Sequence, residues 1–374
     1  MLVGSFSLLQ CFACLRDPRG KRPKKHLFLD MVAIAICAVI AGADDWPKIE
    51  AFGRARLPWL KRFLALPNGI PSHDTFERVF AALSPRAFQR CFLLWVAELA
   101  QALQAKHFAI DGKALRSSGC AASGLGVLHL VSAWATQAHL SLGQVAVADK
   151  SNEITAIPPL LDLLDLHGAL VSIDAMGCQK EVARRVVEGG GDYLLTVKGN
   201  QGHLEEDILK TFLAAEEVGY QGVRYDEHVT EERGHGRHAK RHYTVIYDLE
   251  HIREQDKWQK LTVVGRCYSE RTAAGQTSYE LRLFIGSKEA DAAFYGKGLR
   301  GHWGIENGQH WQLDVTFAED HSAIRQRNAA QNFALLRRMA LSLLKRHPGK
   351  GSLATKRYQA ALDVELLEEI LKGC

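Results

Sequence analysis

Apolar residues recur at helical spacing through the first part of the chain, from about residue 26 to residue 105. The unbroken apolar run from Met31 to Ala43 predicts one buried helix. Further on, Ser72 or Asp74 can cap a helix whose apolar residues share one face. The pattern therefore predicts a small helical module over residues 1–105.

The periodicity changes at His107, where an apolar strand, HFAI, runs directly into an aspartate and a glycine. The segments that follow predict two strands joined near Gln137, a helix over 154–167 and a buried strand over 169–175. A helix, a further strand and another helix are predicted after these. This order predicts a mixed sheet with helices on its faces, an α/β fold, over residues 106–221.

Strict alternation of polar and apolar residues marks the chain from 222 to 288, which is typical of an antiparallel sheet. We expect a β-rich insertion there. Helical patterns return over 289–346 as the remainder of the same domain, and 347–374 is expected to be a C-terminal tail.

The composition indicates an ordinary globular protein. The chain has 374 residues, of which 47% are hydrophobic and 24% charged, so two or three domains are expected. A formal net charge of +5 fits a polyanionic partner such as nucleic acid, although many proteins with other partners share it.

Eight cysteines are spread too widely for a disulfide framework and are expected to be reduced, buried thiols. Cys11 and Cys14 form one C-x-x-C pair, but zinc needs two more ligands and no second pair follows at a usable spacing. The run from Met31 to Ala43 follows a basic stretch, as in a signal peptide, but falls short of the ~20 residues that span a membrane. A cytoplasmic protein without membrane contact is expected.

Two aspartates, Asp111 and Asp174, each close an apolar strand. A carboxylate there is partly desolvated and therefore costly unless a cation or a donor compensates it. Phosphoryl transfer on nucleic acid uses such hard oxygen ligands to hold two magnesium ions. Each aspartate, taken singly, could equally be a hydrogen-bonded turn residue.

A third acid, Glu306, lies in the helical segment after the insertion, where His302, Glu306 and His310 are spaced by four and would share one helix face. That ladder could alternatively bind a transition metal such as zinc. If the helix presented a different face, one of three nearby acids could be the third metal ligand instead. These acids are Asp314, Glu319 and Asp320. Acids at a helix start more commonly cap the helix or form ion pairs.

Basic residues cluster over 233–242, 297–303 and 325–346. Phosphate contacts need such charge near a catalytic pocket. The last cluster, which includes Arg337, Arg338 and Lys345, could instead belong to a core helix with one solvated face.

Five phrases of the chain, HFAIDGKALR, VADKSNEITAIPPLLDLLDLHGALVSIDAMGCQ, GGDYLLTVKGNQ, RGHGR and HWGIENGQHWQLDVTFAEDHS, resemble the DDE transposases of the insertion-sequence group that includes the Rhs-linked H-repeat proteins. The resemblance covers almost the full chain. It implies a ribonuclease-H-like catalytic core interrupted by the β-rich insertion, with Asp111, Asp174 and Glu306 as catalytic residues and metal ligands.

The same resemblance implies two Mg²⁺ ions, for which Mn²⁺ can substitute, and terminal inverted repeats and target DNA as partners of a homo-oligomer. An inactive or domesticated DNA-binding protein and a metal-dependent nuclease that does not join DNA are the alternatives. The residues expected to contact DNA are Lys198, Arg233, Arg237, Lys297, Arg300, His302, Trp303 and Arg325.

The chain departs from wider relatives around the glutamate. His302 stands where an arginine would precede Glu306 by four residues, and Leu313 stands where a lysine would follow it by seven. Lys297, Arg300 or a protonated His302 are the candidate replacements for gripping the terminal phosphate.

Overall fold

A computed structural model describes residues 10–21, 23–103, 106–119, 125–147, 152–234 and 236–372. The chain divides into two compact units. Unit 1 comprises Met1–Gln104, Gly112–Ser151 and Glu306–Cys374, and unit 2 comprises Ala105–Asp111 and Asn152–Ile305. Each unit is therefore assembled from segments that are far apart in the sequence.

The strands of the described residues hydrogen-bond in the order β3-β2-β1-β4-β5-β9-β8-β7-β6, and β1 contributes residues to both units. This mixed sheet with flanking helices confirms the predicted fold class. The strands are β1 (His107–Leu115), β2 (Leu128–Ala135), β3 (Leu140–Ala146), β4 (Leu170–Ile173), β5 (Asp192–Val197), β6 (Tyr225–Gly234), β7 (Arg237–Ile246), β8 (Val263–Ala273) and β9 (Gln276–Gly286).

Unit 2 combines a parallel and an antiparallel part. Strands β1, β4 and β5 run parallel. Strand β9 then pairs antiparallel with β5, with Leu194 opposite Gly286 and Val197 opposite Leu283, and β8, β7 and β6 follow antiparallel. The antiparallel strands expected after residue 222 are present, and they extend the main sheet rather than forming a second one.

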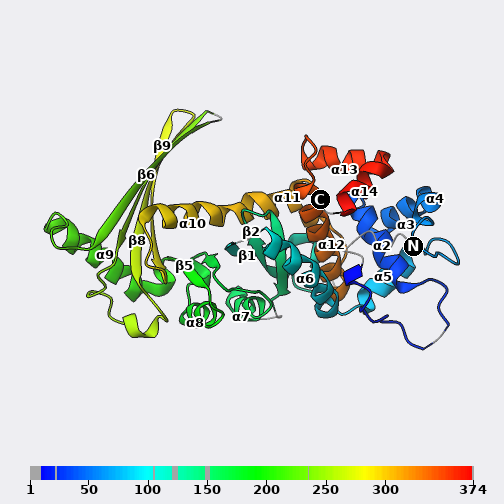
Figure 1. The fold of residues 1–374 in the computed structure, drawn as a ribbon, viewed down its shortest axis with the longest axis horizontal. Helices are drawn as coiled ribbons and strands as arrows, with labels where there is room; N and C mark the ends of the chain where they lie inside the picture. Colours follow the sequence, from blue (N-terminus) through cyan, green and yellow to red (C-terminus); the bar gives the residue numbers. More distant parts are fainter. Residues whose placement is uncertain are drawn as a thin grey trace. The chain divides into compact units, whose positions relative to one another are not determined.

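Helix α10 (Ala292–Ile305) packs against this sheet, and Figure 1 shows it beside the strands of the antiparallel part. The approach is close at Gly298, where a Cβ atom would lie 2.6 Å from Leu194 Cδ2. Tyr295 and Leu299 of the same helix belong to a buried apolar cluster with Phe284 of β9. A glycine thus lets the helix that carries several predicted site residues lie directly on the strands.

The other helices of unit 2 are α7 (Ile157–Leu161), α8 (Lys180–Glu188) and α9 (Gly202–Glu217). The helix predicted over 154–167 is wrong in length, since α7 ends at Leu161. A turn follows α7 in the predicted helical range. Asp165 Oδ1 accepts a hydrogen bond from His167 N there, and Gly168 has φ of +68°. A left-handed glycine and an aspartate turn stop a helix whatever its apolar period.

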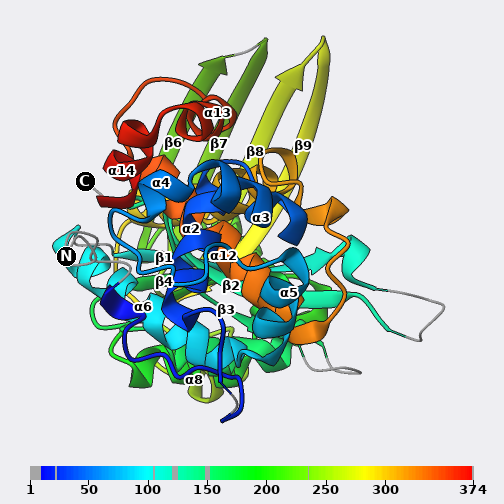
Figure 2. The same ribbon diagram turned by 90° about the vertical axis from the view of Figure 1, so that its right-hand side faces the viewer.

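Unit 1 is built around α2 (Phe28–Ile40), which is buried along its length, and α12 (Arg327–Arg346), which packs on it (Figure 2). The buried helix expected near Met31 is confirmed. No helix within the described ranges is long and apolar enough to cross a membrane. The remaining helices are α3 (Trp46–Ala55), α4 (Leu57–Leu60), α5 (His73–Ala82), α6 (Pro85–Ala102), α11 (Trp311–Val315), α13 (Leu353–Leu362) and α14 (Val364–Lys372).

The N-terminal helices are attached to α12 by a buried amide. Asn332 Nδ2 donates hydrogen bonds to the carbonyl oxygens of Phe80 at 2.8 Å and Leu83 at 2.9 Å, at the end of α5. Trp46 and Phe333 also pack edge to face, with ring centroids 4.9 Å apart. The predicted domain boundaries remain predictions, but the helical N-terminal region and the C-terminal helices share one core.

Candidate functional site

Asp111 and Asp174 follow the last residues that pair between two neighbouring parallel strands, β1 and β4. Asp174 comes directly after β4, but Asp111 lies inside β1, which continues to Leu115, so the prediction that Asp111 closes its strand is wrong. In the β1–β4 register, His107 lies opposite Leu170 and Ile110 opposite Ile173, so the next residue on each strand is one of the two aspartates. Both side chains are half-buried. The carboxyl ends of parallel strands meet at one edge of a sheet, where ligands of α/β proteins bind.

The charge of Asp111 affects the ionisation of Asp174. Burial raises the pKa of Asp174 above its usual value, and the nearby charge of Asp111 raises it further. A hydrogen bond from Gly177 N to Asp174 Oδ1, at 3.3 Å, and the proximity of His302 act in the opposite direction without cancelling the rise. Two carboxylates close together at one edge of a sheet are oxygen ligands of the kind that hard divalent cations bind.

The loop after β5 joins this edge of the sheet. Asn200 Nδ2 donates to the carbonyl oxygen of Ala175 at 2.7 Å, and Gln201 Nε2 donates to that of Cys178 at 2.9 Å. Lys198, which directly follows β5, is exposed at the start of this loop. The structure thus places Lys198 at the carboxyl end of the third parallel strand.

A chain of three buried polar side chains lies on the sheet of unit 2. His107 Nε2 is 2.8 Å from Ser172 Oγ, and Ser172 Oγ is 3.2 Å from His302 Nδ1. Burial, together with the nearby His302, lowers the pKa of His107 to about 4, so His107 is neutral at pH 7. The serine hydroxyl can donate to one ring while accepting from the other.

Sequence reasoning missed His107 and Ser172, although a signal existed. His107 precedes Asp111 by four residues and Ser172 precedes Asp174 by two, so each shares a face of its strand with an aspartate. Polar residues on the aspartate face of two buried strands indicate a polar network. Nothing in the sequence indicated that His302 of α10 would complete it.

Trp303 of α10 is surrounded by guanidinium groups. Arg282 lies 4.4 Å from the ring centroid, Arg300 5.2 Å and Arg241 5.6 Å. One acid, Glu232, accepts from Arg300 at 2.9 Å and from Arg241 at 3.1 Å. The structure therefore brings the predicted Arg300 and Trp303 together, and adds Arg241 and Arg282, which the sequence reasoning did not single out.

The remaining basic candidates of unit 2 lie apart from the aspartates. Arg233 and Arg237 are exposed at the turn that joins β6 to β7, where Gly234 pairs with Arg237. Arg233 is also 2.8 Å from Glu231, so part of its charge is already compensated. Lys297 is exposed on α10.

Glu306 begins a π-helical segment, Glu306–His310, between α10 and α11. The segment that carries Glu306 and His310 is therefore π-helical, not α-helical as the sequence predicted. Glu306 itself is exposed. Single π turns inside α-helices occur frequently at functional sites.

The rival third acids of unit 1 are held by cations. Lys113 Nζ lies 2.6 Å from Asp314 Oδ1 and 3.0 Å from Asp320 Oδ1. Glu319 is 1% exposed and accepts from Arg338 Nη1 at 3.0 Å. These three acids form ion pairs with Lys113 or Arg338. Glu306, by contrast, is exposed.

The basic stretch over 325–346 is divided between core and surface. Arg337 and Arg338 are 1% and 0% exposed and lie near Glu319, so they belong to the core of unit 1 rather than to a DNA-binding face. Lys345 lies 5.7 Å from the ring centroid of Trp134. Arg325, in the loop before α12, is exposed.

Asp111 and Asp174 supply a donor set that fits a hard divalent cation: two carboxylates at one sheet edge whose mutual repulsion a cation would relieve. Within the described part of the chain, no group of three or more histidine, cysteine or acidic side chains is arranged to hold a metal ion. This finding covers the set of His302, Glu306 and His310 and the set of Asp111, Asp174 and Glu306 alike.

Comparison with known proteins gives the family. The family described as "Transposase DDE domain" matches residues 102–343, and the one described as "DDE_Tnp_1-associated" matches residues 9–96. A solved piggyBac transposase synaptic complex with hairpin DNA aligns at 9% identity and a TM-score of 0.41, covering 99% of this chain and 78% of that chain, a likeness too low to carry an argument.

Several Escherichia coli proteins named as transposases are similar over the full chain. YncI of strain O157:H7 is 40% identical over 98% of this chain and 95% of its own length. The H repeat-associated YhhI of strain K12 is 36% identical over 98% of both chains. A shorter relative, YbfQ of strain K12, is named an inactive transposase and is 48% identical over 19% of this chain and 86% of its own length. The chain belongs to the DDE transposase family, in the group that includes the H repeat-associated proteins.

Proposed function

We propose that this protein is an active transposase that cuts the ends of its insertion sequence and joins them to target DNA. Asp111, Asp174 and Glu306 would hold two divalent cations, either Mg²⁺ or Mn²⁺. These cations would activate the attacking oxygen and stabilise the leaving oxygen. The observation that carries this proposal is the pair of aspartates at one edge of the sheet, where burial and then the nearby charge of Asp111 raise the pKa of Asp174.

The role of Glu306 is supported by elimination. Among the acids of its segment, Asp314, Asp320 and Glu319 are paired with Lys113 or Arg338. Glu306 is exposed and forms no ion pair with a described residue. It is the acid best suited to bind a cation rather than a protein side chain.

DNA would be held by residues of several elements. Lys198 stands at the sheet edge of the two aspartates, where it can contact a phosphate next to the reacting one. Trp303 and Arg300 offer an aromatic and a guanidinium surface on α10. The further DNA contacts that we propose are Arg233, Arg237, Lys297, His302 and Arg325.

The domain roles follow from these placements. Residues 1–105 would bind the DNA ends, 106–221 and 289–346 would form the catalytic core, 222–288 would be its insertion and 347–374 its tail. Joining two ends requires at least two active sites, so the protein would act as a homo-oligomer on DNA in the cytoplasm.

The function is tested by incubating the purified protein with DNA that carries its flanking inverted repeats, in the presence of Mg²⁺. We expect strand breaks at the repeat ends, and covalent joining of those ends to a supercoiled target plasmid. Breaks without joined products would identify a nuclease, and binding without breaks would identify an inactive protein of this fold; either result overturns the proposal.

A second prediction concerns His302, which contacts Ser172 and lies near Asp174, and which we expect the contact with Ser172 to position. Substitution His302→Leu leaves the Ser172 hydroxyl without its second partner and should destabilise the protein by about 1–3 kcal/mol. It should also raise the Mg²⁺ concentration needed for half-maximal cleavage. His302→Asn, which can keep a hydrogen bond to Ser172, should restore much of both properties.

Urea unfolding of the metal-free protein and Mg²⁺ titration of cleavage measure the two effects separately. Equal behaviour of His302→Leu and His302→Asn in both measurements would show that the bond to Ser172 does not position this side chain. Phe294→Leu, a change on the same helix at a partly buried apolar residue, is the matched control and should leave the Mg²⁺ requirement unchanged.

A further inference from the structure

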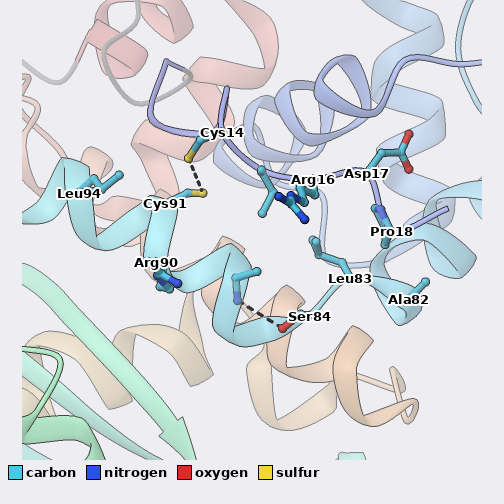
Figure 3. A pocket seen from close by; sticks show the side chains of 12 residues that line it. Cys14, Arg16, Asp17, Pro18, Ala82, Leu83, Ser84, Arg90, Cys91 and Leu94 are labelled. Atoms are coloured by element: carbon cyan, nitrogen blue, oxygen red, sulfur yellow. Dashed lines mark hydrogen bonds between the residues drawn. The ribbon is translucent and has the colours of Figure 1, made fainter. Parts of the chain in front are cut away.

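A cavity of about 600 Å³ lies in unit 1 between the N-terminal segment around Leu15 and the helix α6 (Figure 3). Its walls are partly apolar, with Leu15, Leu83 and Leu94, and partly polar. Two cysteines, Cys14 and Cys91, face each other at its edge. The proposed transposase chemistry makes no use of this cavity.

The two thiols are in contact. Cys14 Sγ is 3.7 Å from Cys91 Sγ, at a distance where one thiol donates a hydrogen bond to the other. Cys91 is 3% exposed, whereas Cys14 is exposed. The sequence-based expectation that the cysteines are buried is therefore wrong for Cys14, because its segment lies on the surface of α6 rather than inside a core.

The charge around the thiols favours an anionic ligand. Arg16 and Arg90 both line the cavity and are exposed, and neither forms an ion pair with a described residue. The one acid of the lining, Asp17, is already 2.8 Å from Arg19 and 3.2 Å from Lys24. Two available guanidinium groups beside an exposed thiol suit a small molecule that carries carboxylates.

We propose that this cavity is a thiol–disulfide exchange site for a small disulfide bearing carboxylates, of the glutathione class, and that exchange there joins Cys14 to Cys91. Cys14 is the entering thiol because it is exposed to solvent. Cys91 is the resolving thiol because it is buried directly behind it.

The thiol–disulfide exchange takes place in two steps. The Cys14 thiolate attacks one sulfur of the small disulfide, forming a mixed disulfide and releasing one small thiolate, which takes up a proton. The Cys91 thiolate then attacks Cys14 Sγ, forming the internal disulfide and releasing the second small thiol. Two protein thiols are oxidised, and one small disulfide is reduced to two thiols.

The second step should be the slow one at neutral pH. Burial raises the pKa of Cys91 to about 12, and its hydrogen bond to Cys14 contributes in the same direction. The two sulfur atoms must also approach to ~2.05 Å, which the turn that carries Cys14 can allow more readily than α6 can. The resulting bond would tie the N-terminal segment to α6.

The experiment treats the full-length protein with oxidised glutathione at pH 7 and pH 9, blocks remaining thiols with N-ethylmaleimide, and maps disulfides by mass spectrometry. We expect a Cys14–Cys91 disulfide that forms faster at pH 9. Cys91→Ser should stop at glutathione bound to Cys14, and Cys14→Ser should form neither product. Cys11→Ser, the matched control, should behave as the original protein does.

Two further arms make the proposal refutable. Arg16→Gln with Arg90→Gln should slow the reaction with oxidised glutathione by at least about threefold, but not the reaction with uncharged 2-hydroxyethyl disulfide. Equal slowing with both reagents would overturn the anion site. A map showing Cys11 joined to Cys14, or glutathione remaining on Cys14 of the original protein at pH 9, would overturn the role of Cys91.

Discussion

Substitution Asp174→Asn is expected to abolish Mg²⁺-dependent cleavage of the element's ends and, at the same time, to raise the thermal stability of the metal-free protein. Burial and the charge of Asp111 raise the pKa of Asp174 in the folded state. The folded protein therefore holds this proton more tightly than the unfolded chain, so stability falls as the pH rises through the interval between the two pKa values. At pH 7 the ionised carboxylate is a cost, and the amide removes it.

The stability gain is measured by thermal unfolding in EDTA at pH 5 and pH 7, and it should be larger at pH 7. Mg²⁺ should raise the midpoint of the original protein but not that of the variant, because the variant lacks a ligand. Asp111→Asn should also lose cleavage. For each variant the loss of cleavage is expected to be at least ~10²–10³-fold.

Asp192→Asn is the matched control, because Asp192 begins strand β5 instead of following a strand end. Its Oδ1 lies 2.8 Å from both Lys260 Nζ and Ser287 Oγ. The change should lower stability and leave cleavage by the folded protein intact. If Asp174→Asn instead destabilised the metal-free protein, this would contradict the proposal that the ionised Asp174 carboxylate is unfavourable when no cation is bound.

Glu319→Ala is expected to destabilise the protein by about 3–5 kcal/mol, because it leaves two buried guanidinium groups without their acid. Arg338 and Arg337 lie 3.0 Å and 4.0 Å from Glu319 Oε1, and all three side chains are almost fully buried. Glu306→Ala should change stability by less than about 0.5 kcal/mol, because that side chain is exposed. Chemical unfolding of both variants measures the difference.

Cleavage should show the opposite ranking. Glu306→Ala should lose activity while remaining folded and bound to DNA, and Glu319→Ala should retain activity in proportion to its folded fraction at low temperature. Cleavage that survives in Glu306→Ala but is lost from folded Glu319→Ala would replace Glu306 by Glu319 as the third ligand.

Local pattern was enough for much of the fold. The apolar run after Met31, the strand that begins at His107 and the alternation after residue 222 each reflect a period of a few residues, and each element is present. This local information also indicated that Asp174 follows a strand, whereas β1 continues past Asp111 to Leu115. Glu306 needed the family resemblance, since nothing in its spacing separated it from Asp314 or Glu319.

Pairing between distant segments decided the rest. Lys113 forms ion pairs with Asp314 and Asp320, and Arg338 forms one with Glu319. Acids that the sequence could not distinguish therefore differ in their surroundings. The same holds for the contact of Cys14 with Cys91 and for the π-helical turn at Glu306.

The sequence by itself determined where the buried apolar strands lie, because neighbouring positions carry a strand's pattern of polar and apolar residues. Only the tertiary structure decided which charges are neutralised, which thiols meet and which polar groups lie behind the aspartates. These properties depend on burial and on distances between chain segments that the order of residues does not contain.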